Sequence, residues 1–306
     1  MRVLTLDQIR PAIDEDAVID AMRDALIAQS RGECDTPMPM HLDIADPTTN
    51  GEVHIKSSYR RGGKYFALKM ASTFHGKGNG MILLCDAATG KPLVYLDDAG
   101  HLTDVRTAAV AAMTARELRR TDRSIGILGT GIQARLTAFY HQHVLPLQQI
   151  FLWGRNPDRA QACAADIRGG FSRVFPRIKV DVLDSPAAVA QATSLIVTCT
   201  AARAPLLDAS DLQPGTHISA VGSDSPGKQE LNPAILRVAD LVLADSLLQC
   251  EKLGELQHAP EQAARAIEIG KFCEQSHAAS SSVADFTGLG IEDLFIAELI
   301  YANGNF

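Results

Sequence analysis

Three charged residues stand among apolar or small neighbours, where they could act on an anionic substrate. Lys69 lies inside "YFALKMAS", Arg106 follows "LTDV", and Asp224 follows "ISAVGS". A buried ammonium needs an anion or a route to the sheet edge, because an unpaired buried charge is very costly. A guanidinium on a first helical turn can grip a carboxylate, and a carboxyl group can exchange a proton. Each residue also fits a structural role: Lys69 reaching solvent, Arg106 in a surface ion pair, Asp224 in an ordinary turn.

The stretch "SIGILGTGIQARL" (124–136) predicts a dinucleotide-binding turn. Gly129, Gly131 and Ala134 form the pattern GxGxxA between an apolar strand and a helix. The first glycine permits a tight turn, the second lets the backbone approach a pyrophosphate, and the small third residue lets the helix pack on the strand. A glycine turn in an unliganded sheet is the alternative.

The residues after the second strand indicate which nucleotide would bind. The segment "WGRNPDR" offers Arg155 where an acid would hold the ribose of NAD, and its first acid is Asp158. Arginine can pair with a 2′-phosphate, so we predict NADP(H), with NAD(H) possible and a solvated Arg155 as the alternative. Thr200 would touch the nicotinamide ribose or be a satisfied strand-end threonine. The predicted cofactor contacts are Gly129, Thr130, Gly131, Ile132, Gln133, Ala134, Arg155, Asn156, Thr200, Val221 and Gly222.

The elements that must position these residues follow two patterns. Residues 40–98 alternate with period two between turn-forming residues, which predicts an antiparallel meander. Asp104 offers an N-cap for a helix over 105–120, and strands then alternate with helices, which predicts a parallel sheet covered on both faces. Residues 1–26 suggest an amphipathic helix, "HGKGNG" (75–80) a loop, and "HAASSSVADFTGLG" (277–290) a hinge. Near Asp224, Lys228 and Glu230 are expected to be solvated charges or supporting groups.

Composition limits the class of protein. The chain has 306 residues, 46% of them hydrophobic and 21% charged, with a formal net charge of −7. This balance argues against a nucleic-acid partner, and no apolar run reaches the ~20 residues that span a bilayer. The acidic N-terminus resembles no signal peptide, and the six cysteines lack metal-binding spacing. His141 and His143, two apart on a helix, point to different faces. We expect a cytoplasmic protein without disulfides or a metal site.

The motifs "EVHIKSSY", "FALKMAS", "LTDVRTAA", "IGILGTGIQA", "GSDSPGKQEL" and "TGLGIEDL", in this order, resemble the ornithine cyclodeaminase and mu-crystallin family. The resemblance implies an α/β fold: a Rossmann-type doubly wound parallel sheet (121–285) plus an α+β domain (1–120, completed by 286–306) for dimerisation and substrate binding. It implies that Lys69 and Arg106 bind the substrate carboxylate and that Asp224 handles a proton, with Lys69 as the next candidate.

One departure from the family pattern concerns the substrate end of the site. Members usually carry Pro-x-Arg before the first sheet strands, and here that region reads "TPMPMHLDI" without arginine. Met40, His41 and Lys56 are candidates to replace it. The meander has few helices nearby to cover both of its faces, so we also expect one face to pack against its copy in a homodimer.

Three functions compete. The first is NAD(P)H-dependent reduction of a small α-imino acid, cyclic or acyclic, to an α-amino acid, which needs cations for the carboxylate and an acid for the nitrogen. The second is a cyclodeaminase acting on a diamino acid with bound NAD. Arg155 disfavours this function, because it predicts NADP(H) rather than NAD. The third is a non-catalytic NADPH-binding protein, which Lys69, Arg106 and Asp224 together disfavour.

Overall fold

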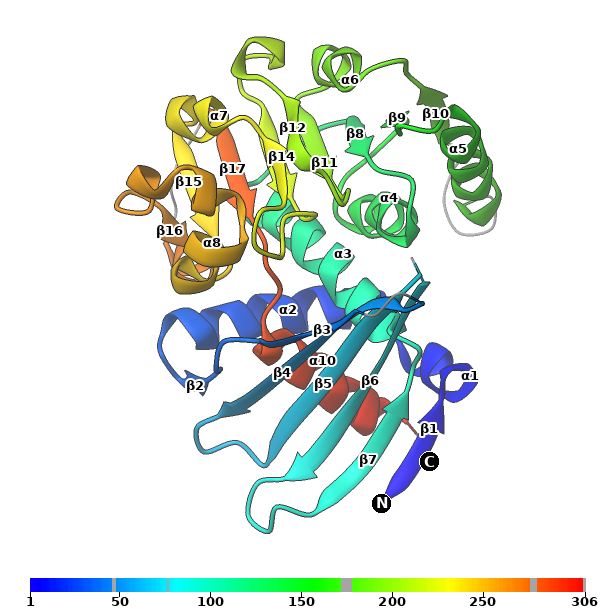
Figure 1. The fold of residues 1–306 in the computed structure, drawn as a ribbon, viewed down its shortest axis with the longest axis vertical. Helices are drawn as coiled ribbons and strands as arrows, with labels where there is room; N and C mark the ends of the chain where they lie inside the picture. Colours follow the sequence, from blue (N-terminus) through cyan, green and yellow to red (C-terminus); the bar gives the residue numbers. More distant parts are fainter. Residues whose placement is uncertain (46–47, 76, 172–177, 276–279, 305–306) are drawn as a thin grey trace. The chain divides into compact units, whose positions relative to one another are not determined.

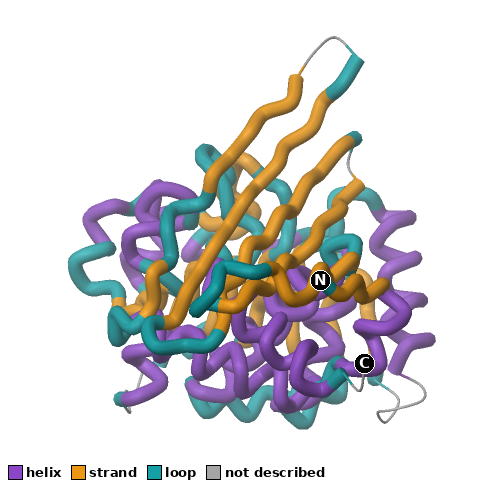
Figure 2. The backbone as a smooth tube through the Cα atoms, turned by 90° about the horizontal axis from the view of Figure 1, so that it is seen from below, coloured by secondary structure: helices purple, strands orange, loops and turns teal. Residues whose placement is uncertain are grey.

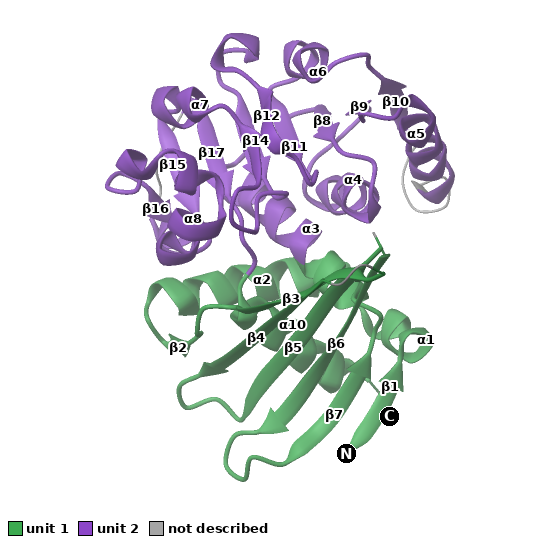
Figure 3. Ribbon diagram, in the orientation of Figure 1, with its two compact units in different colours: residues 1–106, 289–306 green, residues 107–288 purple. Residues whose placement is uncertain are grey.

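The computed structural model describes residues 1–45, 48–75, 77–171, 178–275 and 280–304. The chain forms two compact units (Figure 3): unit 1 contains Met1–Arg106 and Leu289–Phe306, and unit 2 contains Thr107–Gly288. The first division falls inside helix α3 (His101–Glu117), whereas sequence analysis placed it after the predicted helix, at residue 120.

Unit 1 is built on a mostly antiparallel sheet in the order β1-β7-β6-β5-β4-β2, with β3 paired to β4 (Figure 1). Its strands are β1 (Arg2–Thr5), β2 (Cys34–Asp35), β3 (Met40–Ala45), β4 (Asn50–Arg60), β5 (Tyr65–Phe74), β6 (Lys77–Asp86) and β7 (Pro92–Asp97). Figure 2 shows β3 and β4 as long strands running side by side. The meander predicted over 40–98 is confirmed.

Helices cover one face of this sheet. Helix α10 (Gly290–Asn303) packs against β4, β5 and β6, and α2 (Glu15–Ser30) packs on α10. Gly290 permits the close approach, because a Cβ there would lie 2.6 Å from the Ser57 carbonyl oxygen. The C-terminal segment therefore completes unit 1 by burying the sheet face from which Ile82, Leu84, Val94 and Leu96 project.

Three local predictions for unit 1 are wrong. The N-terminal segment begins with β1 and continues with α1 (Leu6–Ile9) and a 3₁₀ helix (Arg10–Ala12), and α2 starts only after Asp14 caps it. Residues 77–80 of "HGKGNG" form the start of β6, because pairing with β5 orders them; Gly76 lies outside the described residues. Helix α3 begins at His101, since Asp98 Oδ2 accepts from the Leu102 N–H at 2.6 Å, so Asp104 is not its N-cap.

Unit 2 is a doubly wound parallel sheet in the order β10-β9-β8-β11-β13-β17-β15-β16. The strands are β8 (Ser124–Leu128), β9 (Gln149–Trp153), β10 (Lys179–Val182), β11 (Leu195–Thr198), β13 (His217–Ala220), β15 (Leu241–Ala244), β16 (Ile267–Glu268) and β17 (Ser282–Asp285); β12 (Arg203–Leu207) pairs separately with β14 (Gln229–Leu231). The strand order reverses between β8 and β11, where ligands bind in open α/β sheets. The predicted fold class is confirmed.

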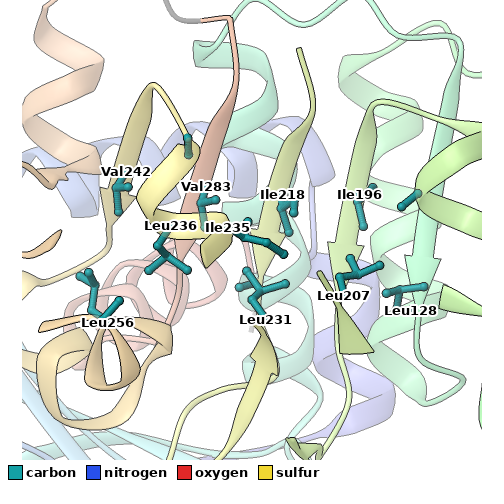
Figure 4. Close-up of a cluster of buried hydrophobic side chains, with 14 of the residues drawn as sticks. Leu128, Ile196, Leu207, Ile218, Leu231, Ile235, Leu236, Val242, Leu256 and Val283 are labelled. Atoms are coloured by element: carbon teal, nitrogen blue, oxygen red, sulfur yellow. The ribbon is translucent and has the colours of Figure 1, made fainter. Parts of the chain in front are cut away.

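Helices connect these strands. They are α4 (Ile132–Val144), α5 (Pro157–Phe171), α6 (Pro186–Ala192), α7 (Pro233–Val238), α8 (Leu247–Leu253) and α9 (Ile269–Glu274), with 3₁₀ turns at Ala209–Asp211, Glu255–His258 and Pro260–Gln262. Side chains from five strands, among them Leu128, Ile196, Ile218, Val242 and Val283, form a buried core (Figure 4). This rigid sheet supports the loops at its carboxyl edge.

The predicted hinge is wrong where the structure describes it. Residues 282–285 form β17, a buried strand that pairs in parallel with both β13 and β15. Small side chains suit a strand covered on both faces, and their polar composition obscured it. Residues 277–279 of the proposed hinge lie outside the described residues.

Candidate active site

The glycine turn of unit 2 has the geometry of a nucleotide-binding turn. Gly129 has φ 142°, and a Cβ there would lie 2.6 Å from the Cys199 sulfur and 2.7 Å from its carbonyl oxygen, so only glycine fits. At Gly131, the residue before α4, an added Cβ would have nothing within 4 Å, and no side chain caps the helix. Ala134 is fully buried against the sheet. The first helical turn thus presents backbone N–H groups beside open space, which suits an anion.

The other predicted residues of this turn lie around the glycines. Thr130 packs on the end of β9, since a Cβ at Gly154 would lie 2.3 Å from the Thr130 methyl carbon. Ile132 and Gln133 open helix α4, and Ile132 is exposed. Arg135, which sequence analysis missed, donates to the carbonyl oxygens of Thr130 and Gly131 at 2.8 and 3.0 Å. This arginine fixes the carbonyl groups and so the shape of the turn.

Arg155 and Asn156 lie just after β9, at the carboxyl edge of the sheet. Both are exposed. Asn156 Oδ1 accepts from the Arg159 N–H at 2.9 Å and so caps α5, which is a structural role. Among the described residues no ion-pair partner is recorded for Arg155. Its position after the second strand of the parallel sheet is the one that sequence analysis assigned to recognition of the ribose.

A buried glutamate ties together the ends of two central strands. Glu230 Oε1 accepts from the Thr200 N–H and hydroxyl at 2.6 and 2.7 Å, and Oε2 accepts from the Thr198 hydroxyl and the Gly222 N–H at 2.7 and 2.8 Å. Val221 follows β13, directly before Gly222, and is nearly buried. Glu230 is thus a supporting group and not a solvated charge. Thr200 fits the satisfied strand-end role, because its hydroxyl is already bonded.

Further carboxylates continue this support away from the site. Glu255 accepts from the backbone N–H groups of Glu230 and Leu231 at 2.7 and 3.2 Å, and Asp285 accepts from those of Glu255 and Leu256, both at 2.9 Å. Asp245 does the same for Thr287 and Gly288, at 2.7 Å each. No local sequence signal marks this network, because its members are scattered along 56 residues of chain from Glu230 to Asp285.

Burial governs the protonation of these acids. Burial, together with the smaller effect of the nearby Asp285 carboxylate, raises the pKa of Glu255 to about 8. Burial also raises the pKa of Asp285 to about 7 and that of Glu230 above its ordinary value. The backbone hydrogen bonds oppose these shifts without cancelling them.

Asp224 occupies the loop between β13 and β14. Its side chain is 47% exposed, and Oδ1 lies 2.6 Å from Lys228 Nζ and 3.0 Å from the Ser225 hydroxyl. Lys228 is 16% exposed and so is less solvated than sequence analysis expected. Glu230 closes this loop, since its side chain binds Gly222 at the start and its own backbone ends it. The loop presents an accessible carboxylate with an adjacent proton donor.

In unit 1, strand register gathers the other predicted residues. Lys56 lies directly opposite Lys69 across β4 and β5, so both side chains project from the face that α10 covers. Their exposed fractions are 9% and 3%. The pKa of Lys69 is lowered to about 7, mainly by burial and to a smaller extent by the neighbouring Lys56 and Arg106 charges. The Asp293 carboxylate opposes this shift. Two lysines side by side attract an anion.

Arg106 meets two acids that sequence analysis did not assign. Its Nη1 donates to Glu292 Oε2 at 2.9 Å and its Nε donates to Asp293 Oδ1 at 3.1 Å. Asp293 Oδ2 lies 3.8 Å from Lys69 Nζ. Arg106 lies in the second turn of α3 and not in the first, where sequence analysis predicted it, and its ion pairs are buried rather than at the surface. The motif "GLGIEDL" contained the signal, as two adjacent acids beside apolar residues.

His41 lies beside this group on the same sheet face. Its ring centroid is 4.5 Å from that of His54, its cross-strand partner, and its Nε2 lies 2.9 Å from Asp43 Oδ1. His54 precedes Lys56 by two residues, so alternation places both on one face. Met40 points to the opposite face. Of the three candidates to replace the missing arginine, His41 and Lys56 therefore share a face with Lys69.

The histidines and cysteines form no further site in the part of the chain that the structure describes. Within the described ranges, no group of three or more His, Cys, Asp or Glu side chains could hold a metal ion, and all six cysteines are free thiols. His141 is buried and bonds the Thr137 carbonyl at 2.9 Å. No described helix is both long and apolar enough to cross a membrane.

The chain matches known proteins over its whole length. A putative dehydrogenase of Rhizobium meliloti is 35% identical over 327 residues, which cover 100% of this chain and 96% of the relative. A protein of Sinorhizobium fredii named as an uncharacterized cyclodeaminase is 34% identical over 324 residues, covering 98% and 95%.

A solved structure shows the same fold. The Delta(1)-pyrroline-2-carboxylate reductase of Thermococcus litoralis, in complex with NADH and L-proline, has a TM-score of 0.88 and 22% identity, covering 99% of this chain and 97% of that one. The model of the ornithine cyclodeaminase/mu-crystallin family matches residues 2–305. The resemblance inferred from the motifs is thereby confirmed, and this chain belongs to the ornithine cyclodeaminase/mu-crystallin family.

Proposed function

We propose that the protein reduces a small α-imino acid to an α-amino acid with NADPH, and with NADH less well. The cation cluster of unit 1 is the observation that carries this proposal. Lys56, Lys69 and Arg106 are buried in this cluster, where Lys69 and Arg106 face the acids Glu292 and Asp293. Buried cationic side chains favour a ligand that brings a carboxylate.

The glycine turn supports the choice of cofactor class. The open space at Gly131 and the backbone N–H groups of the first α4 turn would hold the pyrophosphate, and Arg155 would pair with a 2′-phosphate. When bound, the reduced nicotinamide would supply a hydride to the C=N carbon. Thr200 and Gly222, fixed by Glu230, would border the nicotinamide end.

Asp224 would supply the proton. Reduction of C=N consumes one hydride at carbon and one proton at nitrogen, and a protonated nitrogen makes the carbon a better hydride acceptor. Lys228 Nζ, 2.6 Å from the carboxylate, can return the proton from solvent. Lys69 and Arg106 would meanwhile hold the substrate carboxylate and keep the reacting carbon in place.

Asp224→Asn tests this assignment. Asparagine keeps the shape but cannot exchange a proton, so turnover should fall by roughly 10²-fold while NADPH binding, followed by fluorescence titration, stays unchanged. Asp184→Asn, at an exposed acid of the same unit, is the matched control and should leave turnover unchanged. Parent-like turnover in Asp224→Asn with a raised Michaelis constant would assign Asp224 to substrate holding instead.

Arg155→Asp tests cofactor preference. It turns attraction for a 2′-phosphate into repulsion and should weaken NADPH binding by about 2 kcal/mol, with much less effect on NADH. Arg123→Asp removes an exposed arginine at the amino end of β8 and serves as control. Equal losses for the two nucleotides would show that Arg155 does not discriminate between them.

The cyclodeaminase reaction remains the second candidate, favoured by the name of the Sinorhizobium fredii relative. Purified protein can be incubated with NADPH or NADH and a panel of α-keto acids plus amines, pyrroline-2-carboxylate and L-ornithine. Reductase activity consumes the reduced nucleotide. Cyclodeamination instead releases ammonia from L-ornithine and leaves the amount of reduced nucleotide unchanged. Product mass and absorbance at the nicotinamide band separate the two outcomes.

We further propose that the sheet of unit 1 forms a homodimer through its helix-free face. On that face Met40, Leu42 and Ile44 of β3 are 57%, 43% and 41% exposed. Light scattering should give twice the chain mass of 32.8 kDa, and Leu42→Glu should give a monomer, with Asp43→Asn on the opposite face as control. A monomeric parent protein would contradict this assembly.

The six free thiols support a reducing compartment, so the cytoplasm is the proposed location.

A further inference from the structure

The start of helix α10 places two acids inside the protein. Acids in the first turn of a helix usually lie in solvent, where they stabilise the N-terminus. Glu292 and Asp293 instead have exposed fractions of 0% and 1%. Glu292 Oε1 caps its own helix by accepting from the Leu289 N–H at 3.2 Å, and Gly290 lets the helix end press against β4. The packing of α10 therefore delivers two carboxylates to the cation cluster.

These two acids fix the guanidinium of Arg106. Glu292 accepts from Nη1 and Asp293 accepts from Nε, at 2.9 and 3.1 Å. Two hydrogen bonds at different nitrogens of a planar group determine both its direction and the tilt of its plane. Because its two partners lie on the rigid helix α10, Arg106 keeps one orientation before any substrate arrives.

The second oxygen of Asp293 is differently placed. Oδ2 has no hydrogen-bond partner among the described residues and lies 3.8 Å from Lys69 Nζ, within ion-pair range but beyond hydrogen-bond distance. The charged groups facing Lys69 are Lys56 from β4, Arg106 from α3, and Glu292 and Asp293 from α10; β6 contributes the apolar Ile82. Asp293 is the largest influence that favours the charged ammonium.

We propose that Asp293 is the positioning residue of the substrate cations: one oxygen fixes the Arg106 fork, and the other, 3.8 Å from Lys69 Nζ, favours the charged form of this buried lysine. This deepens the proposed function and rests on it for the identity of the ligand. Without Asp293, burial and the two neighbouring cations would lower the pKa of Lys69 further, so a smaller fraction of this side chain would be charged at neutral pH. A neutral amine attracts a carboxylate far less than an ammonium does.

Asp293→Asn tests the proposal, because it keeps the shape and the Arg106 contact but removes the charge. In full-length protein labelled with ¹³Cε-lysine, the Lys69 resonance, assigned by its loss in Lys69→Met, should titrate at least one pH unit lower than in the parent. Glu298→Gln removes a partly buried acid farther along α10 and is the control; Lys69 should titrate there as in the parent. An unchanged Lys69 titration in folded Asp293→Asn overturns the proposal.

A second variant covers the case in which Asp293→Asn does not fold. Glu292→Gln removes a more distant acid, so Lys69 should shift in the same direction by less, and a shift upward or none would count against the proposal. In activity assays of Asp293→Asn, the pH at which the Michaelis constant for imino acid rises should move down, with kcat little changed at lower pH. The titration uses no substrate, so absence of reductase activity would refute the proposed function while leaving this test intact.

Discussion

Two groups of buried carboxylates, one in each unit, are satisfied differently. In unit 1, Glu292 and Asp293 face the side-chain cations Arg106 and Lys69. In unit 2, Glu230, Glu255 and Asp285 accept mainly from backbone N–H groups, and no cation lies among the partners recorded for them in the described ranges. A cation between side chains can accept an added anion, whereas a carboxylate bonded to backbone immobilises a loop. The first arrangement suits ligand binding and the second suits support.

Removing Arg106 should have the largest effect on stability. Arg106→Leu leaves two buried carboxylates facing an apolar side chain, so the free energy of unfolding should drop by about 3–5 kcal/mol, measured by urea denaturation. Arg61→Leu breaks an exposed pair with Asp35, with a 2.8 Å contact, and should cost under about 1 kcal/mol. Similar losses of unfolding free energy in the two variants would show that the ion pairs of Arg106 contribute no more to stability than an exposed pair does.

The pH dependence of stability should differ in sign between the units. In unit 2, Glu255 has its pKa raised to about 8 from an ordinary 4.5, so between these pH values the native state binds a proton that the unfolded state has lost. The free energy of unfolding therefore falls as pH rises through this window. Glu255→Gln cannot titrate, so its stability deficit relative to the parent should shrink by a few kcal/mol from about pH 5 to pH 8.

In unit 1 the sign is reversed. The pKa of Lys69 is lowered from 10.5 to about 7, so between these values the unfolded state holds a proton that the native state has released. The free energy of unfolding of the parent then rises with pH. Lys69→Met cannot titrate, so its free energy of unfolding should fall relative to that of the parent from about pH 7 to pH 10. If the stabilities of Glu255→Gln and Lys69→Met, each measured relative to the parent, change with pH in the same direction, the predicted difference between the two groups is wrong.

Glu230→Gln should have a smaller effect, because it removes a charge but few contacts. Each carboxylate oxygen accepts from one backbone N–H, at Thr200 and at Gly222, whereas in glutamine only the carbonyl oxygen can accept and the NH₂ nitrogen cannot. One buried N–H is left unsatisfied, at a cost of about 1–3 kcal/mol in the free energy of unfolding. Glu251→Gln, at an exposed position, is the control. A neutral result would mean that the strand ends hold without this clamp.

Local sequence was sufficient where one element carries its own signal. The predicted alternation of strands with helices is confirmed in β8, β9, β10, β11, β13 and β15 and in the helices α4 and α6, whereas β12 and β14 were not predicted. Strand β17 was missed because "SVAD" is too short and too polar to stand out, and only its two parallel neighbours make it a strand. Pro11 breaks the predicted N-terminal helix, and pairing with β7 makes a strand of the first residues.

The candidate site divides in the same way. Residue types and spacing alone determined the glycine turn, the position of Arg155 after the second strand, and the unusual placement of Lys69, Arg106 and Asp224, because these are properties of contiguous segments. Tertiary structure decided that Lys56 faces Lys69, that Glu230 is buried, and that Glu292 and Asp293 hold Arg106 from 186 and 187 residues away. A sequence specifies which groups a chain carries. Which of them lose their water and meet depends on the packing of segments distant along the chain, and that packing sets the charge balance of the site.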